Sequence, residues 1–350
     1  MVDIKTLLKI TMDHESSDLH LTVDTPPVLR INGDIKLMEN QELLTTDKLK
    51  NLIYSILTDL QKEKFERDKE LDFSFAPQGY DRFRVNVHLQ RGNVEAAFRR
   101  VPQRIPQLSE LGLPAIAEEL ARKNNGFVLV TGPTGMGKST TMAAMLDLIN
   151  SERESVIICI EDPIEFVHPN KKSIIKQREV YADTHSFSEA LKRALRQDPD
   201  VIVVGEMRDL ETIGTALTAA ETGHLVLATL HTPDAPQTVE RIIDVFPPHQ
   251  QRQVRLQLGD CLQGVMSQQL LPKAEGGGRI LATEVMIATP GIRNLVREGE
   301  IAQLPTLIQT GAQYGMRTMD KCLKELYKKK LITYEVALSK VKNVEEFKIL

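Results

Sequence analysis

Residues 132–140 read GPTGMGKST and follow the apolar run FVLV at residues 127–130 after one threonine. Two glycines flank four residues, and a lysine, a serine and a threonine come next. Such spacing is typical of a tight loop between a strand and a helix, because glycine accepts backbone angles that other residues avoid. The backbone N–H groups of this loop and the positive end of the helix dipole suit an anion. The segment is therefore predicted to hold phosphate groups.

The residue types in this loop point to a nucleoside triphosphate with Mg²⁺. Lys138 is expected to bridge the terminal phosphates, and the Ser139 hydroxyl is expected to ligate the metal. The alternative, an ordinary glycine loop, is disfavoured by the apolar strand before the loop and the helix after it. The nucleotide-binding residues that we predict are Gly132, Pro133, Thr134, Gly135, Met136, Gly137, Lys138, Ser139 and Thr140.

Four short, unbroken apolar runs define the second half of the chain. They are FVLVT (127–131), SVIICI (155–160), VIVV (201–204) and LVLAT (225–229). Continuous apolarity, as opposed to alternation, indicates strands that are covered on both faces, which is typical of a largely parallel sheet with helices between the strands. The fold class expected here is α/β.

Polar residues follow each of these runs, where ligands bind in open parallel sheets. Glu206 follows VIVV and one glycine, which is the place of a Walker B acid that holds Mg²⁺ through water or orients the attacking water. Glu161 opens the acidic cluster EDPIE at a neighbouring strand end. His231 follows the last run and could sense the terminal phosphate. Taken singly, the two acids could be solvated loop charges, and the histidine could be a hydrogen-bonded edge of the core.

The first hundred residues have a different pattern, typical of a small α+β domain. Residues 18–35 suggest two short strands around a Pro-Pro turn, and residues 45–65 have helical spacing with Thr46 as the expected cap. Residues 82–100 alternate apolar with polar side chains around a turn, with Arg82 and Arg84 on the polar face. Three prolines mark a connector at residues 101–114.

Composition limits the setting and the partners. A net charge of −4 and a pI near 6.1 weigh against a nucleic-acid partner. The three cysteines are widely separated and form no CxxC pair, so we expect a reduced, cytoplasmic setting. Apolar runs stay well short of the roughly 18 residues of a spanning helix. We therefore expect a protein that is neither exported nor embedded in a membrane.

Several motifs in order give the chain a specific resemblance. The strings SSDLHLTVDTPPVLRINGDI, GPTGMGKSTT, IEDPIEF, ALRQDPDVIVVGEMRD, HLVLATLHT and GIRNLVRE resemble the PilT family of secretion-type ATPases, the retraction motors of type IV pili. The resemblance runs from about residue 3 to beyond residue 320. It implies an N-terminal PAS-like α+β domain (1–100), a linker (101–114), a RecA-like P-loop ATPase core with a mainly parallel sheet (115–290) and a C-terminal helical region (291–350).

The resemblance also implies ligands, partners and a location. ATP and Mg²⁺ would be bound by a homohexamer in the cytoplasm, associated peripherally with the inner membrane at the pilus base. The pilus platform protein would be its partner there, a PilU-like accessory ATPase a further one, and no nucleic acid is expected. ATP binding would close the cleft between the two domains of a subunit, and hydrolysis would reopen it.

The family's catalytic roles fall on matching residues of this chain. Glu161 would be the water-activating base, Glu206 the Walker B acid, and His231 would couple the nucleotide state to subunit movement. Arg82 and Arg84 match arginines that reach a neighbouring subunit's nucleotide, although two arginines on a solvated strand face are the alternative. Weaker candidates for the same subunit interface are Arg193, Arg196 and Arg208, which lie beside the Walker B strand in the sequence.

The chain departs from the family pattern at three positions. Gly291 and Val296 stand where the motif AIRNLIRE has alanine and isoleucine, and we expect Gly291 at a helix cap. Met136 stands where the loop usually has serine, and we expect it to contribute its backbone more than its side chain.

Three rival functions remain as alternatives. Assembly and type II secretion ATPases carry a tetracysteine insertion that this chain lacks. The other rivals are a RecA-like nucleic-acid motor and a factor that binds ATP without hydrolysing it. ATP hydrolysis coupled to pilus retraction is the expected function.

Overall fold

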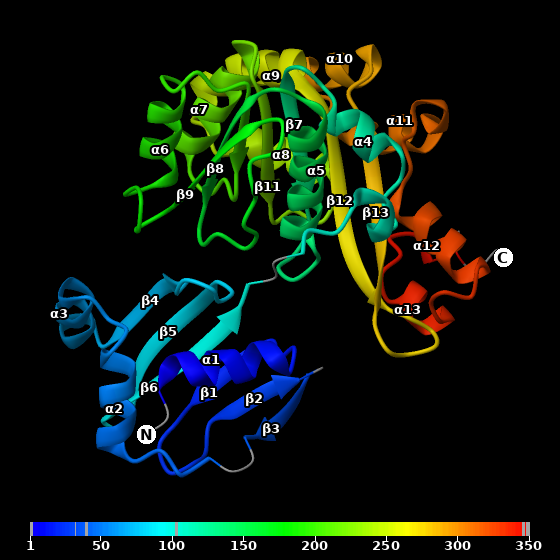
Figure 1. Ribbon diagram of the computed structural model, residues 1–350. Helices are drawn as coiled ribbons and strands as arrows, with labels where there is room; N and C mark the ends of the chain where they lie inside the picture. Colours follow the sequence, from blue (N-terminus) through cyan, green and yellow to red (C-terminus); the bar gives the residue numbers. More distant parts are fainter. Residues whose placement is uncertain (1–2, 32, 39–40, 102–103, 345–346, 348–350) are drawn as a thin grey trace. The chain divides into compact units, whose positions relative to one another are not determined.

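The protein divides into two compact units, Met1–Arg104 and Ile105–Leu350 (Figure 1). The computed structural model describes residues 3–31, 33–38, 41–101, 104–344 and 347. Each unit has its own sheet and its own hydrophobic core.

The first unit is an α+β domain. Its described residues form a six-stranded antiparallel sheet in the order β3-β2-β1-β6-β5-β4. One face of the sheet packs against the helices through fully buried side chains such as Phe83, Val85 and Phe98 with Leu49. The elements are α1 (Ile4–Asp13), β1 (Asp18–Leu21), β2 (Val28–Ile31), β3 (Asp34–Leu37), α2 (Thr46–Tyr54), α3 (Asp59–Asp68), β4 (Glu70–Phe75), β5 (Phe83–Gln90) and β6 (Asn93–Arg100).

The helix expected over residues 45–65 is two helices, so that prediction is wrong in its extent. Thr45, and not Thr46, caps α2 by accepting a hydrogen bond from the Lys48 N–H. A second helix, α3, begins after Thr58, which forms a capping box with Gln61. These reciprocal bonds satisfy the first N–H groups of a new helix, so the apolar spacing continues across a break in the backbone.

The second unit contains the α/β core. Its described residues form a seven-stranded sheet in the order β13-β12-β7-β11-β10-β8-β9, in which only β13 runs antiparallel to its neighbour. The four apolar runs are four of these strands, as the sequence predicted. The strands are β7 (Gly126–Thr131), β8 (Val156–Glu161), β9 (Ile174–Glu179), β10 (Val201–Val204), β11 (Leu225–Leu230), β12 (Leu262–Pro272) and β13 (Arg279–Ile287).

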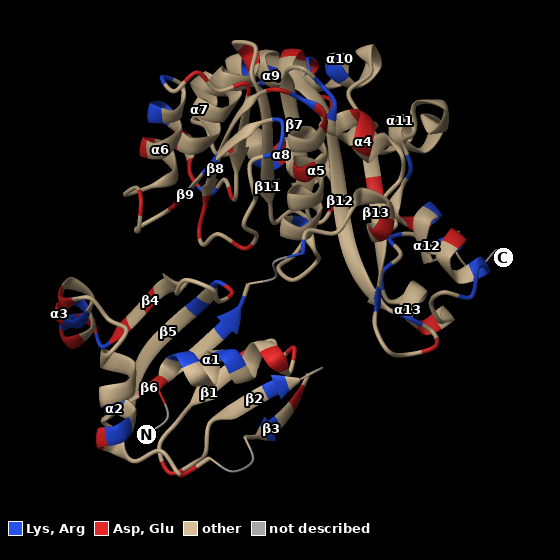
Figure 2. Cartoon of the chain, in the orientation of Figure 1, with Lys and Arg blue, Asp and Glu red and all other residues tan. Residues whose placement is uncertain are grey.

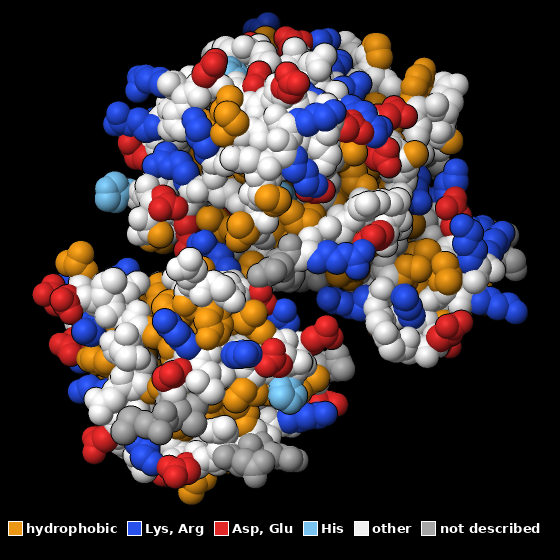
Figure 3. Space-filling model, viewed as in Figure 1, with side chains coloured by type: hydrophobic (Ala, Val, Ile, Leu, Met, Phe, Trp, Pro, Cys, Tyr) orange, Lys and Arg blue, Asp and Glu red, His pale blue; other side chains and the backbone are white. Residues whose placement is uncertain are grey.

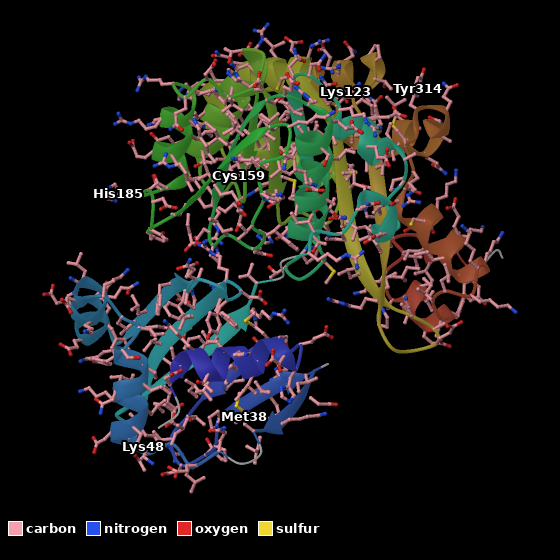
Figure 4. All side chains as sticks on the ribbon, viewed as in Figure 1. Met38, Lys48, Lys123, Cys159, His185 and Tyr314 are labelled. Carbon is pink, nitrogen blue, oxygen red and sulfur yellow. The ribbon has the colours of Figure 1, made fainter. Side chains whose placement is uncertain are left out.

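Helices cover both faces of this sheet (Figure 1). On one face, Val128 and Val130 of β7 pack with α4 (Ile116–Ala121) and α5 (Lys138–Glu152). Phe127 and Leu129 point to the other face. That face is covered by α6 (Phe187–Ala194), α7 (Leu210–Glu221), α8 (Ala235–Asp244), α9 (Pro248–Cys261) and α10 (Pro290–Glu298). Because both faces of the sheet are covered, the strands β7, β8, β10 and β11 have unbroken apolar runs. Cys159 of β8 is one of the fully buried residues of this sheet (Figure 4).

The remaining segments complete the second unit. Residues 102–103 of the expected linker lie outside the described residues, whereas Leu108 is buried against the face that α5 covers. Gly291 is the second residue of α10, and Thr289 is the cap, so the expected cap position is wrong. The C-terminal helices are α11 (Leu304–Thr310), α12 (Met319–Lys328) and α13 (Tyr334–Leu338), and the 3₁₀ turns are Leu108–Leu111, Ile301–Gln303 and Ala312–Tyr314. Among the described helices, none has the length and apolar character to cross a bilayer.

Candidate nucleotide-binding site

The glycine loop connects β7 to α5, as its sequence predicted. Gly132, Gly135 and Gly137 have φ angles of 141°, 78° and 83°, which other residues rarely adopt. Gly132 is also required by space, because a Cβ atom there would lie 2.4 Å from the carbonyl oxygen of Gln268 on β12. The sequence therefore shapes the loop through backbone angles at three positions and through close packing at one.

The N-terminus of α5 fits a phosphate group. The N-cap residue is Gly137, which has no side chain, so no side-chain hydrogen bond caps this helix among the described residues. The first N–H groups of a helix have no partner within the helix, and they attract anions. Ser139 and Thr140 lie in this first turn and are partly exposed. Backbone donors and two hydroxyl groups thus meet where a triphosphate with its metal ion would be held.

Lys138 lies at the start of α5, and its side chain turns back over the loop. Its Nζ donates to the carbonyl oxygens of Gly132 (2.6 Å) and Pro133 (3.1 Å) and lies 3.2 Å from Nδ1 of His231. Burial lowers the pKa of Lys138, and the nearby carboxylate of Glu206 acts in the opposite direction. The ammonium group is thus placed directly at the glycine loop.

His231 and Glu206 lie at the ends of the neighbouring strands β11 and β10 and contact each other. Nε2 of His231 is 3.0 Å from Oε1 of Glu206, and Nη2 of Arg208 donates to Oε2 of Glu206 over 2.7 Å. Partial burial acts to raise the pKa of Glu206, but the bonds from Arg208 and His231 outweigh it and lower that pKa. The structure therefore brings Lys138, His231 and Glu206 together.

Glu161 is the last residue of β8, next to β10 in the sheet. A Cβ atom at Gly205 would lie 3.3 Å from the Cα of Glu161, so the backbones that lead to the two predicted acids are in close contact. Burial raises the pKa of Glu161 to about 7, and the nearby carboxylates of Glu165 and Glu179 act in the same direction. A carboxylate with such a pKa suits proton transfer near neutral pH.

Strands β12 and β13 support the glycine loop from the side. The Leu270 N–H donates to Sδ of Met136 over 3.2 Å, and Nη1 of Arg279 donates to the carbonyl oxygen of Gly135 over 3.3 Å. The side chain of Met136 therefore has a contact of its own, whereas the sequence suggested that its backbone matters more than its side chain. Nothing in the residues of the loop signals this contact, because its partner is more than a hundred positions away.

Arg82 and Arg84 belong to the first unit, at one end of the hairpin β5–β6. Figure 2 shows cationic residues gathered at this end of the hairpin. Arg84 lies opposite Arg99 of β6, and its Nε is 3.9 Å from Oδ1 of Asp72. Like charges directly opposite each other in a sheet are unfavourable without a counter-charge. A role for these arginines toward a neighbouring subunit stays a prediction.

Two residues with prominent contacts were missed or placed differently by the sequence. Gln177 of β9 donates to Glu161 and was not predicted. Arg208 was a weak candidate for a subunit interface and here contacts Glu206 of its own chain. A run such as IIKQRE gave no signal for Gln177, because its relevance comes from the pairing of β9 with β8.

A doubly covered parallel sheet with a glycine loop, a lysine, two acids and a histidine at adjacent strand ends defines a P-loop nucleoside triphosphatase with a RecA-like core. The family model for type II/IV secretion system proteins matches residues 3–346. The chain belongs to the PilT family within these proteins.

Known proteins of this family are similar to the chain over nearly its whole length. The chain is 50% identical to the type IV pilus retraction ATPase PilT of Pseudomonas aeruginosa over 346 residues, which cover 99% of this chain and 100% of that relative. It is 39% identical to the type IV pilus ATPase PilU of the same organism over 349 residues, 100% of this chain and 91% of PilU. A crystal structure of the pilus retraction motor PilT with bound ADP matches with a TM-score of 0.94 at 49% identity and covers 100% of both chains.

Proposed function

We propose that this protein is an ATPase whose hydrolysis of ATP drives the retraction of type IV pili. The contact of Lys138 with His231, and of His231 with Glu206, carries the proposal, because it joins a phosphate-binding lysine to a metal-holding acid. The full-length similarity to a pilus retraction ATPase supports pilus retraction as the work that ATP hydrolysis drives.

The glycine loop and Lys138 bind the phosphate groups of ATP. Ser139 and Glu206 would hold Mg²⁺, the serine directly and the glutamate through water. This division suits Mg²⁺, which keeps several waters and takes few protein ligands. When bound, Mg²⁺ neutralises charge that develops on the phosphate oxygens.

Glu161 acts as the base that takes a proton from the attacking water. Its pKa of about 7 leaves a substantial ionised fraction near neutral pH and makes the proton transfer favourable. The bonds from Arg208 and His231 lower the pKa of Glu206 and favour its carboxylate form, which would hold the metal ion through water. The two acids thus serve different purposes because their surroundings shift their pKa values in opposite directions.

The working form is a homohexamer at the cytoplasmic face of the inner membrane. Arg82 and Arg84 contact the nucleotide of a neighbouring subunit, where arginine stabilises charge on the transferred phosphoryl group. Sequential hydrolysis around the ring moves the pilus platform protein, and a PilU-like ATPase is a further partner.

Two rival functions fit the chain less well. Assembly and secretion ATPases with a tetracysteine site do not match three buried, free cysteines, Cys159, Cys261 and Cys322. A nucleic-acid motor would favour a basic surface, but Figure 3 shows acidic and basic side chains interspersed on the visible face of each unit. Stimulation of ATP hydrolysis by single-stranded DNA would favour this second rival.

A phosphate-release assay tests the proposal. Lys138→Ala and Glu206→Gln should abolish turnover, while light scattering shows an unchanged oligomer. Glu154→Gln is the matched control and should keep the wild-type rate. Glu154 is an exposed acid that precedes the amino-terminal end of β8, whereas Glu161 lies at the carboxyl end of that strand. Unchanged turnover in the Lys138 or Glu206 variant would contradict the proposal.

Mixed assemblies test the arginines separately. Arg82→Ala subunits and Lys138→Ala subunits should each be inactive alone. Their mixture should recover part of the activity, because some interfaces then join an intact arginine to an intact nucleotide site. No recovery at any mixing ratio would contradict a contribution across the interface.

A further inference from the structure

Gln177 lies on β9, the edge strand beside β8. The two strands run parallel, with Cys159 opposite Gln177 and Glu161 opposite Glu179. Alternate residues of a strand share one face, so Gln177 and Glu161 are diagonal neighbours on the same side of the sheet. The glutamine is partly buried there.

Three hydrogen bonds hold the amide group of Gln177. Its Nε2 donates to the carbonyl oxygen of Phe166 over 2.7 Å and to Oε1 of Glu161 over 2.8 Å. Its Oε1 accepts from the backbone N–H of His168 over 2.9 Å. Both hydrogens of the amide nitrogen and its oxygen are therefore in use.

The backbone fixes which way this amide points. A carbonyl oxygen at Phe166 can only accept, and an N–H at His168 can only donate, so exchanging the amide nitrogen and oxygen would lose both bonds. The remaining N–H of Gln177 must then point to Glu161. Because this group can only donate, it favours the carboxylate form of Glu161, the form that can take a proton.

We propose that Gln177 is a positioning residue, which holds the Glu161 carboxylate toward the attacking water and fixes residues 161–168 around it. The inference rests on the proposed role of Glu161 as the base. Among the described residues, the hydrogen bonds of the Gln177 side chain run to Glu161, Phe166 and His168. Gln177 acts through Glu161, so its loss should affect the chemical step and spare the binding of ATP.

Two variants separate positioning from simple support of the loop. Gln177→Leu removes all three bonds at similar size, and Gln177→Glu keeps the acceptor for His168 but removes both donors. Lys176→Gln is the matched control, because the neighbouring side chain points to the opposite face of β9 and is exposed. The readouts are kcat and KM for ATP, the affinity for a fluorescent ADP, and kcat as a function of pH.

Positioning predicts a specific pattern. In both Gln177 variants kcat should fall about 10-fold to 100-fold, with ADP affinity within about twofold of the wild type. The acidic limb of the kcat profile should move to higher pH in Gln177→Leu, since a donor to the carboxylate is lost. Lys176→Gln should behave as the wild type.

A double variant decides how Gln177 acts. In the Glu161→Gln background, Gln177→Leu should cause no further loss in a single-turnover assay, because its target is already gone. A wild-type kcat in both Gln177 variants, or a loss of ADP affinity equal to the loss of kcat, would overturn the inference. Full activity of Glu161→Gln alone would instead show that the proposed base is wrong.

Discussion

The ring of His231 lies between two groups of opposite charge and links them. Its Nε2 is 3.0 Å from Oε1 of Glu206, and its Nδ1 is 3.2 Å from Nζ of Lys138. A ring that has its hydrogen on Nε2 can donate to Glu206 and accept from Lys138 at Nδ1. β11 lies between β7 and β10 in the sheet, which is why His231 is in the middle. His231 thus connects Lys138 to Glu206, the residues that we propose bind the phosphates and the metal ion.

Replacing His231 with alanine should uncouple these two groups. We expect kcat to fall about 10-fold or more, which is the effect of losing one hydrogen bond to a charged group, while nucleotide affinity stays within about threefold. His231→Gln, which retains a donor and an acceptor, should lose less. Phosphate release and titration with a fluorescent nucleotide measure the two effects. Equal activity of His231→Ala and the wild type would contradict the link.

ATP hydrolysis should depend on pH through Glu161. Burial raises the pKa of Glu161 to about 7, with help from the charges of Glu165 and Glu179 and against the hydrogen bond from Gln177. Cys159 is the remaining titratable neighbour on β8, and burial keeps it a neutral thiol by raising its pKa. A base must be ionised, so kcat should rise as the pH increases through about 7 and then level off. Rates at saturating ATP between pH 5.5 and 9 test this; a flat profile would exclude Glu161 as the base.

The same shift should make the contribution of Glu161 to stability less favourable as the pH rises. The pKa of Glu161 is about 7 in the folded chain against an ordinary value of 4.5, so the folded state binds more protons between these two values. The contribution of Glu161 to the unfolding free energy should therefore fall across this window and change little above it. Burial lowers the pKa of His168 to about 4, which acts in the opposite direction at lower pH, so the Glu161 contribution is isolated by comparing variants. Glu161→Gln lacks this loss and should be more stable than the wild type at pH 8, by about 3 kcal/mol, but not at pH 4.5. Urea unfolding at both pH values measures the difference, and a gap that does not change with pH would contradict the shift.

Two glycines should respond oppositely to alanine. At Gly132, with φ of 141° and a carbonyl oxygen 2.4 Å from the new Cβ, alanine should lower the unfolding free energy by about 2 kcal/mol or more and weaken nucleotide binding. At Gly291, inside α10, the new Cβ would meet only Leu307 at an ordinary 3.4 Å. Gly291→Ala should therefore add about 0.5 kcal/mol. Thermal unfolding of both variants checks this, and a destabilised Gly291→Ala would show a constraint that packing does not explain.

The sequence predicted those parts of the fold and site that depend on neighbouring residues. The glycine loop, the four apolar strands and the residues directly after them are each local patterns, and the structure brings Lys138, Glu206 and His231 together as expected. The break between α2 and α3 was missed because helical spacing continues through it, and only the capping box at Thr58 reveals it.

Two of the strands that the sequence did not reveal, β9 and β12, are interrupted by polar residues. β12 carries Ser267 and Gln268, both fully buried, because their side chains bond to Thr131 and Thr141 next to the glycine loop. Buried polar residues with distant partners look like loop residues in a sequence. Gln177 of β9 was missed for the same reason, since its partners are set by tertiary structure and not by spacing.

In the proposed mechanism, Lys138 holds ATP, and the acids at the neighbouring strand ends, Glu161 and Glu206, promote its hydrolysis by water. The most direct test is the single-turnover rate of phosphate release in Glu161→Gln, measured together with ATP affinity. We predict an affinity within about twofold of the wild type and a rate at least about 100-fold lower. A wild-type rate of release in this variant would contradict this mechanism.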